Sequence, residues 1–225
     1  MNGGVAIFVK TPGRSALKTR LAAERGEDYA SGWYRRAAAA VAAVARQAQA
    51  RHGPVAYWAV AEADAGGAWP DLPTLAQGEG GLGERMARVH AQLVARHGFG
   101  LLLGADSPQL TAALLGEAID WLTVPTPRLL LGPANDGGFW IFGGNRALPM
   151  SSWTAVGYSA ADTAERLRES MRAAGDWRTL AALTDVDHAR DLAAVRDALH
   201  RLADPTPEQR ALAQWMDRQE DIPNA

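Results

Sequence analysis

The sequence predicts an α/β protein in which helices cover both faces of a mostly parallel sheet. Short apolar runs rich in β-branched residues or leucine alternate with alanine-rich segments that favour helix. Such alternation is typical of parallel strands joined by crossover helices. The one exception lies within 128–144, where two apolar runs follow each other around Asn135-Asp136-Gly137-Gly138. This pair predicts one antiparallel strand in an otherwise parallel sheet.

The order of the elements follows from the apolar runs and from the residues that interrupt them. The first strand is VAIFV at 5–9, which leads into a loop at 10–20, and a loop rich in Gly, Pro and Asp covers 64–73. Further strands are expected at 55–60, at 100–108, as a pair within 128–144, and at about 178–183. Helices are expected at 28–50, 82–96, 112–121, 160–174, 188–202 and 206–218, with Thr111 as the N-cap of the third.

Composition narrows the class of protein. The chain has 225 residues, 48% of them apolar, which suits a single domain spanning 1–225 with one sizeable core. A net charge of −2 argues against a role on nucleic acid or on a membrane surface, since both need a concentrated basic field. The absence of cysteine excludes disulfides, thiolate catalysis and cysteine-based zinc sites.

The same composition sets expectations for location and assembly. The first residues lack the pattern of a signal peptide, and no run reaches the roughly 18 apolar residues of a membrane-spanning helix. The alanine-rich run at 37–45 instead predicts a helix that packs closely on the sheet. We therefore expect a cytoplasmic protein without membrane insertion. The oligomeric state stays open, and a homodimer is one of the options.

Four polar stretches follow predicted strands, where open α/β sheets bind their ligands. They are KTPGRSALKTR at 10–20, ADSP at 105–108, NDGG at 135–138 and TDVD at 184–187. Because the carboxyl ends of parallel strands share one edge of the sheet, we expect these stretches to meet. Their complementary chemistry, cationic in the first and acidic in the others, predicts a binding site at that edge.

The first of these stretches favours a phosphate ligand. Lys10 and Lys18 are the only lysines of the chain, and they lie with two arginines beside the turn formed by Pro12 and Gly13. Clustered cations beside exposed backbone N–H groups suit a di- or triphosphate. The stretch departs from the P-loop pattern and does not predict one, because Pro12 and Leu17 stand where its two glycines belong. A basic surface loop without a ligand is the alternative, although the concentration of both lysines here argues against it.

Asp106 is the first candidate for a metal ligand. It follows a buried strand and precedes a proline, and Mg²⁺ and Mn²⁺ prefer carboxylate oxygens supplemented by phosphate oxygens. An Asx turn without a metal is the alternative. One carboxylate does not make a site, so Asp136, Asp185 and Asp187 are the candidate partners at neighbouring strand ends.

Two glycine-rich stretches are candidates for close approach to a ligand. Gly137 and Gly138 either let the backbone approach a ligand and present Asp136, or simply close a hairpin. The stretch QGEGGLGERM at 77–86, which includes Gly81 and Arg85, either covers a base or phosphate or forms a surface loop. The histidines form no ligand cluster. Trp140 is expected to pack in the core, with stacking on a ligand ring as the alternative.

Five motifs taken together resemble a known family. They are VKTPGRSALKTRL, QGEGGLGERM, LLLGADSPQL, LLGPANDGGFWIFG and LTDVDHARDL, in that order over residues 5 to about 192. This set is similar to an uncharacterised bacterial family of the glycosyltransferase-A, or nucleotide-diphospho-sugar transferase, superfamily. Some members of that family are named arsenosugar-biosynthesis glycosyltransferases. The resemblance implies a Rossmann-like, three-layer α/β/α sandwich with a mostly parallel mixed sheet and a nucleotide over its N-terminal half.

The resemblance also implies roles for individual residues. Lys10, Lys18 and Arg20 would face the nucleotide phosphates, and Asp106 would hold the catalytic Mg²⁺ or Mn²⁺. Asp187 resembles a second metal aspartate, although His188, Ala189 and Arg190 replace the residues that usually follow it. The usual Asp-x-Asp is incomplete because position 108 is proline, and Phe139 stands where the family often has tyrosine.

Three functions are compatible with these residues. The first is metal-dependent transfer of a sugar from a nucleotide-diphosphate sugar to a small-molecule acceptor, with Lys18, Asp106 and Asp136 as catalytic residues. The second is nucleotidyl transfer from a nucleoside triphosphate to a phosphorylated small molecule, with release of pyrophosphate. The third is nucleotide sensing or partner binding without catalysis, since a fold alone does not define a function.

Overall fold

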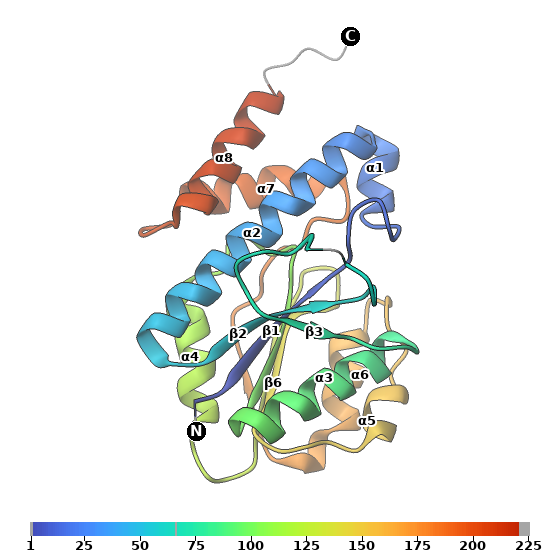
Figure 1. The fold of residues 1–225 in the computed structure, drawn as a ribbon, viewed down its shortest axis with the longest axis vertical. Helices are drawn as coiled ribbons and strands as arrows, with labels where there is room; N and C mark the ends of the chain where they lie inside the picture. The colour runs from blue at the N-terminus through green and yellow to red at the C-terminus, as the bar shows by residue number, and fades with distance from the viewer. Residues whose placement is uncertain (1, 66, 221–225) are drawn as a thin grey trace.

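The computed structural model describes residues 2–65 and 67–220, and within these ranges seven strands form one mixed sheet (Figure 1). The strand order is β3-β2-β1-β4-β6-β5-β7. Strand β6 is antiparallel to both of its neighbours, and the other neighbouring strands of this sheet pair in parallel. The strands are β1 Gly4–Val9, β2 Val55–Val60, β3 Thr74–Ala76, β4 Gly100–Gly104, β5 Arg128–Pro133, β6 Phe139–Gly144 and β7 Asp176–Thr179. The prediction of a single antiparallel strand is confirmed.

Helices cover both faces of the sheet, so the three-layer α/β/α architecture is also confirmed. One face packs against α1, α2, α4, α7 and α8, and the other against α3, α5 and α6. Figure 1 shows α2 and α4 on one side of the strands and α3, α5 and α6 on the other. The helices are α1 Thr19–Arg25, α2 Glu27–His52, α3 Leu82–His97, α4 Ala112–Leu122, α5 Met150–Thr154, α6 Thr163–Ser170, α7 Ala189–His200 and α8 Pro207–Glu220.

Strict alternation along the strands builds the two cores. In β1, Val5, Ile7 and Val9 face one layer of helices, whereas Ala6 faces the other. Buried alanines along α2 keep that helix close to the sheet, as the run at 37–45 predicted. Trp140 is 2% exposed and belongs to the core, and Thr111 caps α4 by accepting a hydrogen bond from the Leu114 backbone N–H.

The structure corrects several element boundaries. Helix α1 begins at Thr19, within the segment predicted as a loop. It was not predicted because Leu21 is its single buried side chain, which leaves little apolar periodicity to detect. Strands β3 and β7 are short edge strands. β3 was not predicted, and β7 begins two residues before its predicted start at 178. The strand expected at 100–108 ends at Gly104, where the acidic turn begins. The short helix α5 was also missed.

The helices of the described ranges differ from membrane-spanning helices. None of them combines the length and the apolar character needed to pass through a bilayer.

Candidate functional site

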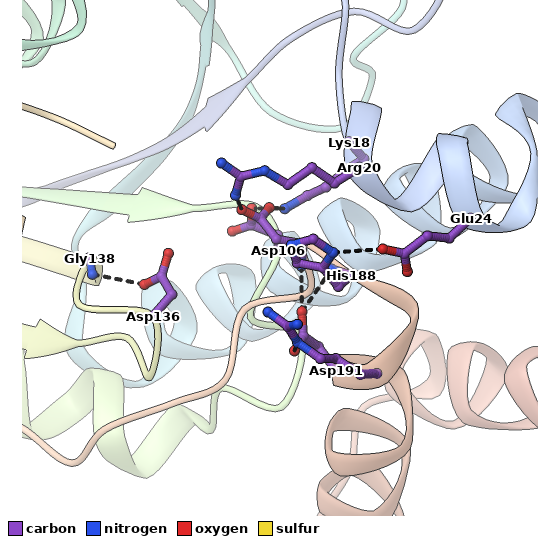
Figure 2. A network of polar contacts seen from close by, with 10 residues as sticks. Lys18, Arg20, Glu24, Asp106, Asp136, Gly138, His188 and Asp191 are labelled. Carbon is purple, nitrogen blue, oxygen red and sulfur yellow. Dashed lines mark hydrogen bonds and ion pairs between the residues drawn. The ribbon is translucent and has the colours of Figure 1, made fainter. Parts of the chain in front are cut away.

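The polar stretches that follow β1, β4 and the last strand meet at one edge of the sheet, as the sequence analysis expected. Residues Lys18 and Arg20 at the start of α1 reach the carboxylates of Asp106, after β4, and Asp187, before α7. Figure 2 shows Lys18 and Arg20 beside Asp106, with Asp136 on the turn between β5 and β6 nearby. Residues more than 160 positions apart in the sequence therefore share one cleft.

Lys18 lies at the centre of this arrangement. Its Nζ donates to Asp106 Oδ2 at 2.6 Å and to Asp187 Oδ1 at 2.9 Å, and its side chain is only 7% exposed. Its backbone is left-handed, with φ 44° and ψ 40°, which is unusual for a residue with a side chain. This conformation turns the chain from the loop into α1 and directs the ammonium toward the strand ends. Arg20 Nη1 contacts the second oxygen of Asp187 at 3.1 Å from a more exposed position.

The charges of this cluster shift the pKa values of its members. Burial lowers the pKa of the Lys18 ammonium, but the charges and hydrogen bonds of Asp106 and Asp187 outweigh burial and raise it above its usual value. Burial raises the pKa of Asp187, whereas Lys18 and then Arg20 lower it, with a net shift downward. Both groups are therefore charged at neutral pH, and the contact is an ion pair.

Asp185 joins Asp106 and Asp187 in a group suited to a metal ion. One carboxylate oxygen from each lies within 4.8 Å of the others. Asp185 and Asp187 flank Val186, which is fully buried, so alternate side chains of this extended segment reach the site. Burial, followed by the charges of Asp106 and Asp136, raises the pKa of Asp185 to about 7. Carboxylate oxygens supplemented by water or phosphate oxygens suit Mg²⁺ or Mn²⁺. A cation, the Lys18 ammonium, already contacts two of the three carboxylates.

The backbone next to Asp187 is held by the first turn of α7. The Asp191 carboxylate accepts hydrogen bonds from the backbone N–H groups of Asp187, at 3.0 Å, and His188, at 2.7 Å. Glu24 of α1 accepts from the Ala189 backbone N–H and contacts His188 Nδ1, both at 2.7 Å. Figure 2 shows this link between Glu24 and His188 beside the cluster. The side chain of Glu24 therefore connects α1 to the start of α7.

Two clefts meet at this cluster, and their linings differ in chemistry. The first has a volume of about 470 Å³, and its charged lining is Lys10, Lys18, Arg20, Asp136 and Asp187. The second, of about 250 Å³, lies between α3 and the turn after α5, and most of its lining is apolar. Its main apolar side chains are Phe8, Leu82, Met86, Phe139 and Tyr158.

The two clefts share Asp136, Ser159 and Ala160. Asp136 Oδ1 accepts from the Gly138 backbone N–H at 2.8 Å, a contact that orients the carboxylate at this junction. A charged group in the first cleft and a ring in the second would therefore both lie against Asp136.

Other predicted site residues occupy the surroundings of these clefts. Pro12 and Gly13 line an adjoining cavity of about 550 Å³ between the loop and α2, which shares Ala16, Leu17 and Thr19 with the charged cleft. Gly81 precedes α3, and Arg85 donates to the Gly80 carbonyl. Neither residue lines one of the two clefts, although Leu82, which follows Gly81, lines the apolar one. Gly137 has φ 91°, and a Cβ there would lie 1.9 Å from the Ala161 carbonyl oxygen. It therefore permits close contact between this turn and the segment before α6.

Sequence reasoning treated Asp185 only as a candidate partner and missed the supports from Glu24 and Asp191. The acidic pair two residues apart in TDVD was the available signal for Asp185. An acidic residue in the first turn of the helix predicted at 188–202 was the signal for Asp191, because acidic side chains there satisfy free backbone N–H groups. Nothing in the sequence indicates Glu24, which reaches α7 only through the fold.

Comparison with solved structures defines the class of fold. A protein of Desulfovibrio desulfuricans G20, provisionally named a nucleotide-diphospho-sugar transferase, is 26% identical with a TM-score of 0.80, and 97% of each chain is covered. The 4-diphosphocytidyl-2C-methyl-D-erythritol synthase of Anaerococcus prevotii DSM 20548 shares the fold at 11% identity and a TM-score of 0.54, covering 89% of this chain and 100% of that one. A CMP:2-keto-3-deoxy-manno-octonic acid synthetase solved with CTP also shares it, at 13% identity and a TM-score of 0.50, with 89% and 99% covered.

The family is defined by sequence. Residues 35–160, more than half of the chain, match the model of a family described as an uncharacterized protein conserved in bacteria, DUF2064. The chain therefore belongs to this bacterial family, and the predicted resemblance is confirmed. No curated protein matches the sequence significantly.

Proposed function

We propose that this protein transfers a sugar from a nucleotide-diphosphate sugar to a small-molecule acceptor, with Mg²⁺ or Mn²⁺ at the carboxylate cluster. The observation that carries the proposal is the cationic cleft of Lys10, Lys18 and Arg20 directly beside Asp106 and Asp187. Cationic side chains next to metal-binding carboxylates suit a diphosphate that binds together with a metal ion. The side chains and the metal ion each neutralise part of the negative charge of the diphosphate. The 26% identity to a protein named as such a transferase, over 97% of both chains, supports the same class.

The charged cleft would hold the diphosphate, which is the leaving group of the reaction. Asp106 and Asp187, with Asp185 beside them, would bind the metal, which as a Lewis acid stabilises charge on phosphate oxygens. Lys10, Lys18 and Arg20 would stabilise the negative charge that develops when the bond between the sugar and the diphosphate breaks. The apolar cleft offers flat side chains against which a sugar or nucleoside ring would pack.

Asp136 would act on the acceptor. Its carboxylate lies where the charged and apolar clefts meet, and one oxygen is fixed by the Gly138 N–H. In sugar transfer, an acceptor hydroxyl oxygen bonds to the anomeric carbon while the bond to the diphosphate breaks. The hydroxyl proton would pass to Asp136, and the electron pair of the broken bond leaves with the diphosphate.

Nucleotidyl transfer is the second candidate, and one observation favours it. Asp187 and Asp185 supply carboxylates in addition to Asp106, and additional carboxylates suit the two-metal arrangement that polymerases use to stabilise the attacking and leaving oxygens. The cationic cleft would then hold the pyrophosphate that leaves. Both reactions use the same residues for binding, so the ligand distinguishes them.

A thermal-shift panel separates the candidates. The full chain, with Mg²⁺ or Mn²⁺, is heated with nucleoside diphosphates, nucleoside triphosphates and nucleotide sugars of each base. A ligand at about 100 times its dissociation constant adds about 2.7 kcal/mol of stability. Sugar transfer predicts the largest shift with one nucleotide sugar and its diphosphate, whereas nucleotidyl transfer predicts the largest shift with one triphosphate.

Two variants control the panel. Asp106→Asn removes a carboxylate without changing its size and should abolish the metal-dependent part of the shift. Asp204→Asn changes an aspartate that is 79% exposed and that, within the described ranges, pairs only with Arg51. It should leave the shift unchanged. If no nucleotide stabilises the protein, or if Asp106→Asn responds like the parent chain, the proposed site is wrong.

A further inference from the structure

Lys18 occupies the position at which a cation would be held by the carboxylate cluster. Its Nζ contacts one oxygen each of Asp106 and Asp187, at 2.6 and 2.9 Å, and both carboxylates belong to the group of three suited to a metal. The Lys18 side chain is 7% exposed, so its charge is compensated by these carboxylates and not by water. Lysine is a compact point charge, which suits it to stand in for a metal ion.

We propose that Lys18 and a divalent cation exclude each other at Asp106 and Asp187. The site then admits the metal together with a diphosphate and not the metal alone. Lys18 is thereby the residue that selects the metal–diphosphate complex over the free metal ion. This inference rests on the metal site of the proposed function, but it concerns the protein without substrate and is tested separately.

Exclusion follows from charge and distance. A Mg²⁺ ion binds oxygen at about 2.0–2.1 Å, so a metal on the same two carboxylates would lie within a few ångströms of the ammonium. Two cations at that separation repel each other, and water screens the buried Lys18 ammonium only weakly. The carboxylate oxygens that Lys18 occupies would also have to release its hydrogen bonds before they could bind the metal.

A diphosphate provides the alternative partner that Lys18 needs. Lys18 already lines the charged cleft together with Lys10 and Arg20, so phosphate oxygens in that cleft lie within reach of its flexible side chain. When the ammonium turns toward phosphate, Asp106 and Asp187 lose their counter-ion. A divalent cation then restores the balance, and it also binds the phosphate oxygens.

Arg20 does not share this role. Its side chain is 61% exposed, and it contacts only the second oxygen of Asp187. It can therefore stay in place while the metal binds on the other side of that carboxylate. Lys18 alone bridges both predicted metal ligands among the described residues.

The exchange couples the two ligands thermodynamically. If a diphosphate removes Lys18 from the carboxylates, it raises the affinity for metal, and by reciprocity the metal raises the affinity for diphosphate by the same factor. Couplings of this kind typically change affinity about 5- to 150-fold. Removing the ammonium should abolish the coupling by making the metal site available at all times.

The test is a titration of the full chain with Mn²⁺ in the absence of nucleotide. The EPR signal of free Mn²⁺ measures how much of the metal is bound. Lys18→Met keeps most of the side-chain length without the charge, and Lys18→Gly suits the left-handed backbone at this position. Circular dichroism confirms that each variant is folded. If one of the two misfolds, the other still decides the question. We expect both to bind Mn²⁺ about tenfold or more tightly than the parent chain.

Lys10→Met is the matched control, because it removes the only other lysine from the same cleft. Among the residues that the structure describes, Lys10 Nζ contacts only the Ala16 carbonyl oxygen and no carboxylate. A gain confined to the Lys18 variants therefore reports exchange at the cluster, whereas an equal gain in Lys10→Met would report net charge and overturn the proposal.

Melting temperatures with Mn²⁺ alone, inorganic pyrophosphate alone and both together provide a second measurement. The parent chain should respond to the pair by more than the sum of the single responses, and Lys18→Gly should respond to Mn²⁺ alone. The proposal is overturned if the parent chain binds Mn²⁺ alone as tightly as the Lys18 variants, or if neither variant gains affinity. A gain in Mn²⁺ affinity without any nucleotide response would retain this inference and reject the proposed function.

Discussion

At the scale of single residues, Lys18 combines an unfavourable backbone with a favourable charge environment. The left-handed conformation costs a non-glycine residue about 1–2 kcal/mol, so the two ion pairs that the side chain forms must offset it. Strain at one residue that is compensated by its partners is common at functional sites. The same geometry limits which cation can replace lysine here.

Exchanging the two types of cation tests this limit. Lys18→Arg should weaken binding of the stabilising nucleotide about tenfold or more. The Lys18 side chain is 7% exposed, and the larger planar guanidinium does not fit between the two carboxylates at this buried position. Arg20→Lys, at a side chain that is 61% exposed, should change affinity by less than about threefold. Isothermal titration calorimetry measures both. Equal effects of the two exchanges would show that the fit of Lys18 is unimportant.

Gly137 illustrates close approach between two segments of the backbone. An added Cβ would lie 1.9 Å from the Ala161 carbonyl oxygen, and the φ of 91° is itself unfavourable for alanine. Gly137→Ala should therefore lower the free energy of unfolding by about 3 kcal/mol or more. Gly13→Ala has a similar φ of 83° but no atom within 4 Å of the added Cβ, so it should cost only about 1 kcal/mol. Urea unfolding distinguishes a steric clash, which predicts this difference, from a purely conformational cost, which predicts equal losses.

At the scale of elements, α1 and α7 act as a pair that supports the carboxylate cluster. The first turn of α7 uses Asp191 to hold the backbone of Asp187 and His188, and α1 contributes Glu24 to the same turn. Acidic side chains at a helix N-terminus also interact favourably with the helix dipole. The position of Asp187 therefore depends on the start of α7 as well as on the sheet.

Asp191→Ala tests this dependence. Loss of the cap should reduce stability by about 1 kcal/mol and should also weaken ligand binding, because Asp187 is no longer held. Asp197→Ala, at the other end of the same helix, removes an exposed carboxylate and should change neither quantity appreciably. Chemical denaturation and the ligand-induced thermal shift give the two readouts. A loss of stability with ligand binding intact would mean that α7 does not position Asp187.

At the scale of the whole molecule, two apolar cores on either side of one sheet hold the strand ends in register. The core beneath α3, α5 and α6 contains one titratable side chain without exposure, His90, whose Nε2 donates to the Gly144 carbonyl at 3.2 Å. Phe142 and Trp153 contact its ring. Burial lowers the pKa of His90 to about 4, so the imidazole is neutral in the folded protein.

This histidine predicts a loss of stability in acid. In the unfolded chain a histidine binds a proton at about pH 6.5, whereas in the folded chain His90 does so only near pH 4. Its contribution is therefore fully present above pH 6.5 and is lost progressively as the pH falls toward 4, by up to about 3 kcal/mol. His90→Gln keeps a donor for Gly144 and removes the titration, so its stability should decline less over this range.

Urea midpoints at pH 7, 6, 5 and 4.5 measure the effect of His90. His200→Gln, which removes a histidine with a half-exposed side chain, controls for the general effect of losing one. Parallel declines of stability with pH in the parent chain and in His90→Gln would contradict the assignment.

The single domain spanning 1–225 and the oligomeric state stay predictions. The same unfolding curves test the single domain, because one domain should unfold in one transition.

By itself, the sequence determined the α/β class, the antiparallel strand, most helices and the sheet edge at which the polar loops meet. These follow from local periodicity, turn chemistry and the rule that parallel strands place their carboxyl ends together. It also indicated Lys18, Asp106 and Asp187 one by one. Short elements such as α1, α5 and β3 escaped because they contain too few buried residues to show a period.

Only the tertiary structure decided which charged groups touch. Lys18 lies 88 positions from Asp106 and 169 from Asp187 in the chain, and no local pattern encodes either distance. The same is true of Glu24, which reaches the first turn of α7 across 165 positions. Side-chain contacts of this kind depend on how the layers pack. The sequence therefore predicts that a lysine lies near the carboxylates, and the fold decides that it occupies the place of a cation between them.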